Sequence, residues 1–222
     1  MLTDLRVPPY LLVQCRPLYS DDAAGVRVGA DQLLHHDGHL STAVWVSEPP
    51  TTRIVAVTDD GQVVLRWRWH HAAGPVWELP GADVLPGMDR DGPAGAARRG
   101  LVEAGWAADD WEYVTELGNV TAVVDRTVHV YAATGLRALD ARPGEDMSTS
   151  HLMAWSDAVA VATGPGLRDA ASIAAVLITQ HRRGLTDRVV RSQQSTYADG
   201  DRRGGTVNPI RCQHGPTHRS GA

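Results

Sequence analysis

Residues 77–106, WELPGADVLPGMDRDGPAGAARRGLVEAGW, combine residue types that handle phosphate. Apolar and polar residues alternate at 77–79 and run into Pro80 and Gly81, which predicts a short strand that ends in a turn. The run AGAARRGLVEA has good helix formers despite two glycines, and Gly105 is placed to end that helix. Because loop N–H groups and a helix N-terminus attract negative charge, this order of elements favours binding of a pyrophosphate.

The same segment resembles the box of the Nudix family, and in particular of its ADP-ribose-pyrophosphatase-like branch. The family box reads G-x5-E-x7-R-E-U-x-E-E-x-G-U, where U is aliphatic. Alignment of WELPGADVLPG puts Ala82 where the first glycine belongs and Met88 where the first glutamate belongs. After two extra residues, AARRGLVEAGW resembles A-A-R-R-E-L-x-E-E-x-G-W shortened by one residue.

Two registers of the helix remain open. If Arg99 is the anchor, Gly100 replaces the glutamate after it and Glu103 is the first acid of the late pair. If Gly105 is the anchor, Glu103 is the last acid of that pair and Arg99 takes the place of the earlier acid. Both registers leave one carboxylate where the family has four.

The loss of acids bears on metal binding, because Mg²⁺ needs several oxygen ligands, usually one or two carboxylates plus waters and substrate phosphates. The resemblance implies a weakly held Mg²⁺ at Glu103, with the Gly81 carbonyl as a co-ligand and Glu103 as a catalytic group. Arg99 beside it would repel the metal and attract phosphate. We therefore expect weakened or lost hydrolysis, and we expect acids restored at Met88 and Gly100 to create or raise metal-dependent activity.

The resemblance covers roughly residues 25–184. The runs at 53–81, 112–137 and 144–161 follow the order of strands, hairpin turn and last helix in the family. It implies an α/β fold: a Nudix-type α/β/α sandwich with a mixed sheet, plus a small N-terminal antiparallel β-sheet. In that branch the early strands often exchange between subunits, so a homodimer is implied here.

A run of basic and aromatic residues precedes the box. Strand alternation puts Arg66, Arg68 and His70 on one face and Trp67 and Trp69 on the other. The functional interpretation is arginines that bind phosphate or carboxylate and Trp69 against a nucleobase. The alternative is a strand with one packed and one solvated face.

Three further residues have two interpretations each. Arg99 binds either phosphate or a carboxylate of its own helix, unless it is simply exposed. Glu78 contacts a ribose or braces the box, or it faces solvent. Glu145, beside Asp146 in a loop bounded by Pro and Gly, is the candidate for a late catalytic base, and the alternative is a solvated acid.

Histidine clusters raise the question of a different metal site. His35, His36 and His39 lie in an expected hairpin turn, HHDGH, and a C-x-H-x3-H pattern lies in the C-terminal segment at Cys212, His214 and His218. Structural zinc sites need four such ligands in a closed geometry. Ordinary turn and tail residues are therefore the preferred interpretation of both.

Composition limits the function classes. All 21 basic residues are arginines and the net charge is −5, which does not indicate a general nucleic-acid binder. No apolar run approaches the length of a membrane span, and the N-terminus has no signal-peptide pattern. The two cysteines, Cys15 and Cys212, indicate no disulfide framework. We therefore expect a cytoplasmic protein without membrane partners.

The expected organisation has three parts. Residues 1–51 form a lead-in (irregular over 1–24) and strands at 26–34 and 41–48. Residues 52–184 form the Nudix-like domain, with strands at 53–58 and 62–69, an Asp60-Gly61 hairpin and a helix within 164–184. Residues 185–222 are expected to be a flexible extension.

The favoured function is a Nudix-fold protein that acts on or binds a nucleoside diphosphate derivative or a similar anionic small molecule. One alternative is a repurposed enzyme that catalyses a metal-independent step with arginine and histidine. The other is a ligand-sensing protein without turnover. A shared fold does not decide among them.

Overall fold

A computed structural model describes residues 10–85, 87–118, 123–139 and 148–184. The chain divides into two compact units, 1–181 and 182–222, and all described residues except 182–184 belong to the first. No helix in the described ranges is long and apolar enough to cross a membrane.

The first strands build a sheet in the order β1-β2-β3-β8. β1 (Tyr10–Asp21), β2 (Val26–His35) and β3 (Leu40–Ser47) are antiparallel neighbours, and β8 (Val124–Asp125) pairs in parallel with β3. The expected strands at 26–34 and 41–48 and the turn at HHDGH are confirmed, and Gly38 in that turn has a φ of 88°. The expected small antiparallel sheet is present in β1, β2 and β3, and the two-residue β8 adds a parallel edge that was not expected.

The expectation of an irregular lead-in over 1–24 is also wrong where β1 lies. β1 contains Pro17, although proline has no N–H to donate to a neighbouring strand. β1 is at the edge of its sheet, and its register against β2 shifts between Pro17 and Tyr19. A strand tolerates proline at an edge position or at a bulge, and both conditions hold for Pro17 in β1.

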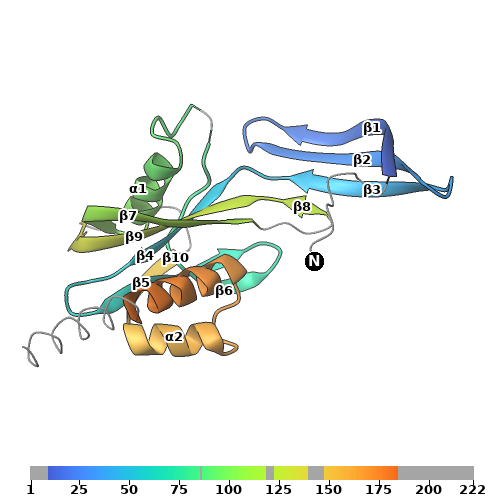
Figure 1. The fold of residues 1–222 in the computed structure, drawn as a ribbon. Coiled ribbons are helices and arrows are strands. Elements are labelled where there is room, and N and C mark those ends of the chain that lie inside the picture. Colours follow the sequence, from blue (N-terminus) through green and yellow to red (C-terminus); the bar gives the residue numbers. More distant parts are fainter. Residues whose placement is uncertain (1–9, 86, 119–122, 140–147, 185–222) are drawn as a thin grey trace, which may run out of the picture. The chain divides into compact units, whose positions relative to one another are not determined.

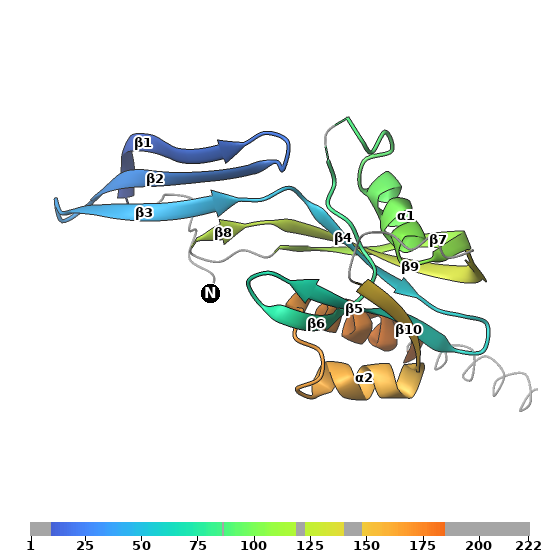
Figure 2. The ribbon, with the colours of Figure 1, turned by 180° about the vertical axis from the view of Figure 1, so that it is seen from behind.

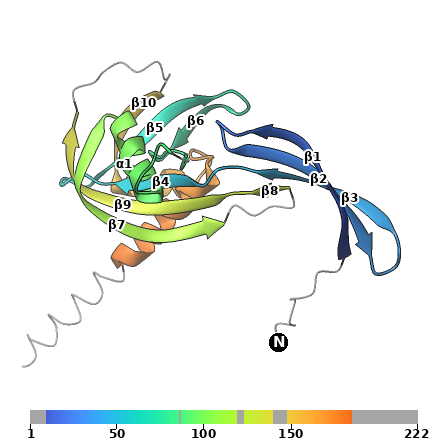
Figure 3. The same cartoon turned by 90° about the horizontal axis from the view of Figure 1, so that it is seen from above.

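The remaining strands form two further sheets. β4 (Thr51–Ala56) is parallel to β9 (Thr127–Ala138), which is antiparallel to β7 (Trp106–Gly118), so this sheet is mixed. β5 (Gln62–His70) lies between β10 (Ser148–Ala154) and β6 (Gly74–Glu78), antiparallel to both. Figure 3 shows β9 between β4 and β7. The expected mixed α/β architecture is confirmed, with three sheets.

Helices cover both faces of this β-structure. Val55 of β4 packs in a core with α2 (Trp155–Thr163) and the helical segment at 170–184, through residues such as Ala158 and Val176. The alternate residue Ile54 packs in a second core with Ala97 and Leu101 of α1 (Pro93–Glu103). Figures 1 and 2 show α1 on the opposite side of β4 from α2. The period-two alternation of a strand thus separates two helix layers.

The C-terminal helix covers only part of the expected range 164–184. Residues 164–169 are not helical, and the helix starts at 170. Asp169 is its N-cap: the Asp169 carboxylate accepts a hydrogen bond of 3.0 Å from the backbone N–H of Ser172. At the end of α1, Gly105 has a φ of 83° and its N–H donates to the Val102 carbonyl, as expected for a C-terminal glycine.

Candidate functional site

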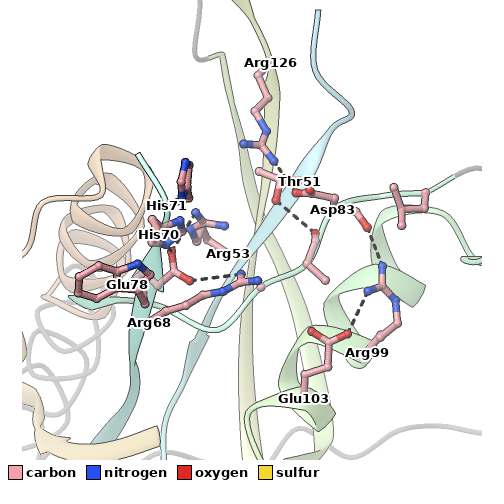
Figure 4. Close-up of a pocket in the computed structure, with 14 residues that line it drawn as sticks. Thr51, Arg53, Arg68, His70, His71, Glu78, Asp83, Arg99, Glu103 and Arg126 are labelled. Carbon is pink, nitrogen blue, oxygen red and sulfur yellow. Dashed lines mark hydrogen bonds and ion pairs between the residues drawn. The ribbon is translucent and has the colours of Figure 1, made fainter. Parts of the chain in front are cut away.

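A pocket of about 580 Å³ lies where β4, the end of β5, β6, the loop after β6 and α1 meet. Figure 4 shows its polar side chains converging from these elements. The lining is mostly charged or aromatic, and it consists of Thr51, Arg53, Arg68, Trp69, His70, His71, Glu78, Gly81, Ala82, Asp83, Leu85, Arg99, Glu103 and Arg126.

The end of β5 supplies the basic and aromatic side chains. Arg68, Trp69 and His70 line the pocket, as the sequence predicts for the first two. Arg66 does not: its side chain is 1% exposed, within the core rather than at the pocket wall. Trp67 packs against Trp77 with ring centroids 5.0 Å apart. Sequence alternation alone could not separate Arg66 from Arg68, because the neighbouring strands bury one and leave the other at the rim.

Glu78 is a buried carboxylate at the centre of this wall, with a side chain only 6% exposed. His70 Nε2 lies 3.1 Å from its Oε2. The guanidinium of Arg53 lies 3.7 Å and that of Arg68 3.8 Å from its carboxylate oxygens. The interpretation of Glu78 as a solvent-facing strand residue is therefore wrong, because β6 turns this side chain inward.

Arg53 fixes this wall to the C-terminal helix. Its Nε donates to Asp169 at 2.7 Å and its Nη1 to the Thr52 carbonyl at 2.9 Å. Burial raises the pKa of Asp169, but the charge and hydrogen bonds of Arg53, with those of Ser172, outweigh it and hold that pKa below its ordinary value. One carboxylate therefore serves as both N-cap and ion-pair partner.

On the opposite wall, Arg99 is held by three oxygen groups. It donates to both carboxylate oxygens of Asp89 at 3.2 and 3.0 Å, to Glu103 at 3.1 Å and to the Asp83 carbonyl at 2.6 Å. The side chain of Asp89 is 3% exposed, and its carboxylate also accepts a hydrogen bond from the backbone N–H of Leu85. The hydrogen bonds from Arg99 lower the pKa of Asp89. Arg99 therefore pairs with a carboxylate of its own helix, one of the two expected roles.

Two glycines bring α1 directly against the loop after β6. A Cβ added at Gly100 would lie 2.5 Å from the Gly81 carbonyl carbon and 2.8 Å from the Ala82 nitrogen. A Cβ added at Gly81 would in turn collide with the Thr52 carbonyl oxygen. Backbone atoms of the loop therefore occupy the position that the Cβ of any other residue at position 100 would take. The expectation that an acid at Gly100 restores the box overlooks this contact, because a glutamate there requires the helix or the loop to move.

Metal-binding groups are sparse in the described ranges. No three His, Cys, Asp or Glu side chains there are grouped so that they could hold a metal ion. His35 instead stacks on His39 with centroids 4.0 Å apart. Met88 is exposed and does not line the pocket. Glu145, Asp146 and the Cys212, His214 and His218 pattern lie outside the described residues. Of the expected metal ligands, Gly81 and Glu103 both line the pocket.

Arg126, just after β8, closes the pocket from the side of the N-terminal sheet. It pairs with Asp83 and with Glu48, the latter at 3.1 Å, and its Nε donates to the Pro49 carbonyl at 3.3 Å. Sequence reasoning missed Arg53, Arg126, Asp83 and Asp89. No local motif marks the first two, since each meets its partners only through contacts between segments distant in sequence. Asp89 directly follows Met88, so the sequence alone shows an acid beside the position where the family box has its first glutamate.

Comparisons with known proteins agree with this architecture. The chain is 29% identical over 126 residues to an ADP-ribose pyrophosphatase from Mycobacterium tuberculosis, a stretch that is 56% of this chain and 60% of that relative. It therefore spans less than two thirds of the relative. The chain also matches the crystal structure of an ADP compounds hydrolase with a TM-score of 0.64 and 15% identity, over 82% of this chain and 97% of that one. The two share a fold. No protein-family model matches the chain.

Proposed function

We propose that this is a Nudix-fold protein that binds a nucleoside diphosphate derivative, or a similar anionic small molecule, in the pocket between β5 and α1. The observation that carries the proposal is that arginines from four separate segments line one pocket of a fold shared with an ADP compounds hydrolase. The similarity to an ADP-ribose pyrophosphatase supports an ADP-linked ligand.

The exposure of the arginines indicates how a ligand would lie. The side chain of Arg68 is 40% exposed, against 13% for Arg53, 28% for Arg99 and 23% for Arg126. Arg68, which pairs with Glu78 at 3.8 Å, is thus the most exposed of the four arginines, and the other three pair with carboxylates at shorter distances. Trp69 beside it is largely exposed and offers a flat surface for a base.

The proposal includes a weakened or lost Mg²⁺-dependent hydrolysis. Glu103 is paired with Arg99, so a cation bound at Glu103 would lie close to a positive guanidinium. Gly100 gives the helix no acid at the next position, and its contact with Gly81 leaves little room for one. In metal-dependent hydrolysis of a diphosphate, the metal neutralises charge and activates water. Among the described residues, the proposed ligands are Glu103 and the Gly81 carbonyl, and a set of this size supports only weak binding of that ion.

Arg68→Gln tests the site. We expect it to weaken ADP-ribose binding about 10-fold to 100-fold, the cost of one charge-assisted contact of roughly 1.5–3 kcal/mol. The measurement is isothermal titration calorimetry in EDTA, with thermal stabilisation by the ligand as a second readout. The control is Arg98→Gln, because Arg98 is an exposed arginine of α1 that pairs with Asp91 outside the pocket. Equal affinity of the two variants would remove Arg68 from the site.

Metal dependence is tested with ADP-ribose and a panel of nucleotide sugars. We expect release of AMP or phosphate to change less than about tenfold between EDTA and millimolar Mg²⁺ or Mn²⁺, because the ligand set is too small for tight metal binding. Metal-stimulated turnover of several orders of magnitude that is abolished by Glu103→Gln would show instead that hydrolysis is intact.

A homodimer forms part of the same proposal. β1 is an edge strand with exposed apolar side chains, among them Leu12 and Leu18, and an edge of this kind is a template for pairing with another chain. We expect light scattering to show a dimer that Leu12→Lys dissociates. Val102→Lys, at an equally exposed apolar residue of α1, should leave it intact. A wild-type monomer at micromolar concentration contradicts this part.

A further inference from the structure

The pocket holds an acid–base pair that hydrolysis through a metal would not require. His70 lines the pocket with a side chain 38% exposed, and its Nε2 lies 3.1 Å from the buried carboxylate of Glu78. An ionised carboxylate can only accept a hydrogen bond, so Nε2 carries the proton and Nδ1 is the basic nitrogen of the neutral ring. A carboxylate behind an imidazole fixes both its tautomer and its orientation.

Two guanidiniums lie beside the carboxylate of the pair. Arg53 of β4 and Arg68 of β5 lie 3.7 and 3.8 Å from Glu78, and Asp169 in turn balances Arg53. Charged and titratable groups that line the pocket with His70 include Glu78 on β6, Arg53 on β4, Arg68 on the same strand and the adjacent His71, with Asp83, Arg99, Glu103 and Arg126 from the loop after β6, α1 and the segment after β8. The guanidiniums of Arg53 and Arg68 are thus both within ion-pair distance of the carboxylate whose Oε2 contacts the imidazole.

We propose that His70, oriented by Glu78, is a general base for metal-independent cleavage of a phosphoanhydride bound in this pocket. This rests on the proposed function and assigns its chemistry. His70 Nδ1 takes a proton from water, and the water oxygen forms a bond to phosphorus. The bond from that phosphorus to the bridging oxygen breaks, and its electron pair leaves with the departing phosphate. His70 is the catalytic residue and Glu78 is a positioning residue.

The location of the pair supports this role. Arg68, the most exposed of the pocket arginines, is two residues from His70 on the same face of β5, so a phosphate bound at Arg68 lies beside the imidazole. A general base must come within hydrogen-bond reach of the proton that it removes, directly or through one water. A neutral imidazole has one ring nitrogen that can accept such a proton.

The test measures AMP released from ADP-ribose, and from a nucleotide-sugar panel, by the full chain in EDTA between pH 5 and 9. We expect metal-free turnover that falls at acidic pH, and His70→Gln should lower it by about 10²- to 10⁴-fold. His151→Gln is the matched control, because His151 is an exposed histidine on β10 that contacts Trp77 outside the pocket. It should retain the wild-type rate.

Glu78→Gln separates positioning from a structural role. We expect a lower rate and a displaced acidic limb of the pH profile, whereas a merely destabilised protein would keep the shape of that profile and lower only the melting temperature. Ligand binding without any turnover in EDTA, or an unchanged rate in His70→Gln, overturns the catalytic role and leaves the proposed function standing. Absence of ligand-induced stabilisation in the wild type overturns the proposed function itself.

Discussion

Gly100→Ala is expected to lower the free energy of unfolding by about 3 kcal/mol, the upper end of the usual cost of overpacking. The added methyl would lie 2.5 Å from the carbonyl carbon of Gly81, and the atoms it meets are backbone atoms that cannot rotate away. For a chain of this size the melting temperature should fall by on the order of 10 °C. Gly100→Glu carries the same Cβ and should be at least as unstable, so an acid alone does not rebuild a metal site here.

Gly95 in the same helix provides a matched control. A Cβ added there meets nothing closer than 3.5 Å, an ordinary contact. Gly95→Ala should therefore raise stability by up to about 1 kcal/mol through the better helix propensity of alanine. Chemical denaturation of the two variants beside the wild type checks both signs. Equal stabilisation by the two replacements would mean that α1 does not pack on the loop as described.

Arg53→Met is expected to cost about 3–5 kcal/mol, because it leaves the carboxylates of Asp169 and Glu78 in a buried site without their shared cation. The exposed pair of Arg137 and Asp109, at 2.8 Å, is the control. Arg137→Met should cost no more than about 1 kcal/mol, since water screens a pair at the surface. The similar lengths of the two pairs make burial the variable that is tested.

The cost of losing Arg53 should also depend on pH. In the wild type, the pKa of Asp169 is held below its ordinary value, so its pairing stabilises the protein above about pH 4 and that contribution is lost as the pH falls through the folded pKa. Without Arg53, only the hydrogen bonds of Ser172 oppose burial, which favours the protonated acid. The difference in unfolding free energy between wild type and variant should therefore shrink as the pH is lowered from 7 toward 3. A difference independent of pH would assign the cost to lost packing.

Much of the fold could be predicted from local patterns. The Asp60-Gly61 hairpin, the strands on either side of it and the end of α1 at Gly105 depend on turn chemistry and alternation that are written in neighbouring residues. β1 could not be predicted in this way. A strand with Pro17 is acceptable at the edge of a sheet, and whether β1 lies at the edge depends on which strands pair with one another. The order of strands in each sheet is likewise a property of contacts distant in sequence.

The candidate site was predictable only in part. Arg68, Trp69, Glu78 and Arg99 line the pocket, and the sequence draws attention to them because they flank a recognisable strand, loop and helix. The burial of Arg66 and the carboxylate partners of Arg99 depend on packing that no pattern encodes. Gly100 shows the limit most clearly. The sequence shows only that an acid is absent at this position. The structure shows in addition that the backbone of the opposing loop occupies the space that a Cβ at Gly100 would need.

The order of strand pairing has a consequence for how the chain acquires its structure. β1, β2 and β3 pair with neighbours in sequence, whereas Thr51 of β4 pairs with Val128 of β9 and Val64 of β5 with Leu152 of β10. Loop closure makes such distant pairings slow relative to local hairpins. The N-terminal hairpins can therefore form while the sheets that carry the pocket still await residues translated much later. During synthesis the exposed edge of β1 is then the surface most open to premature association with a second nascent chain.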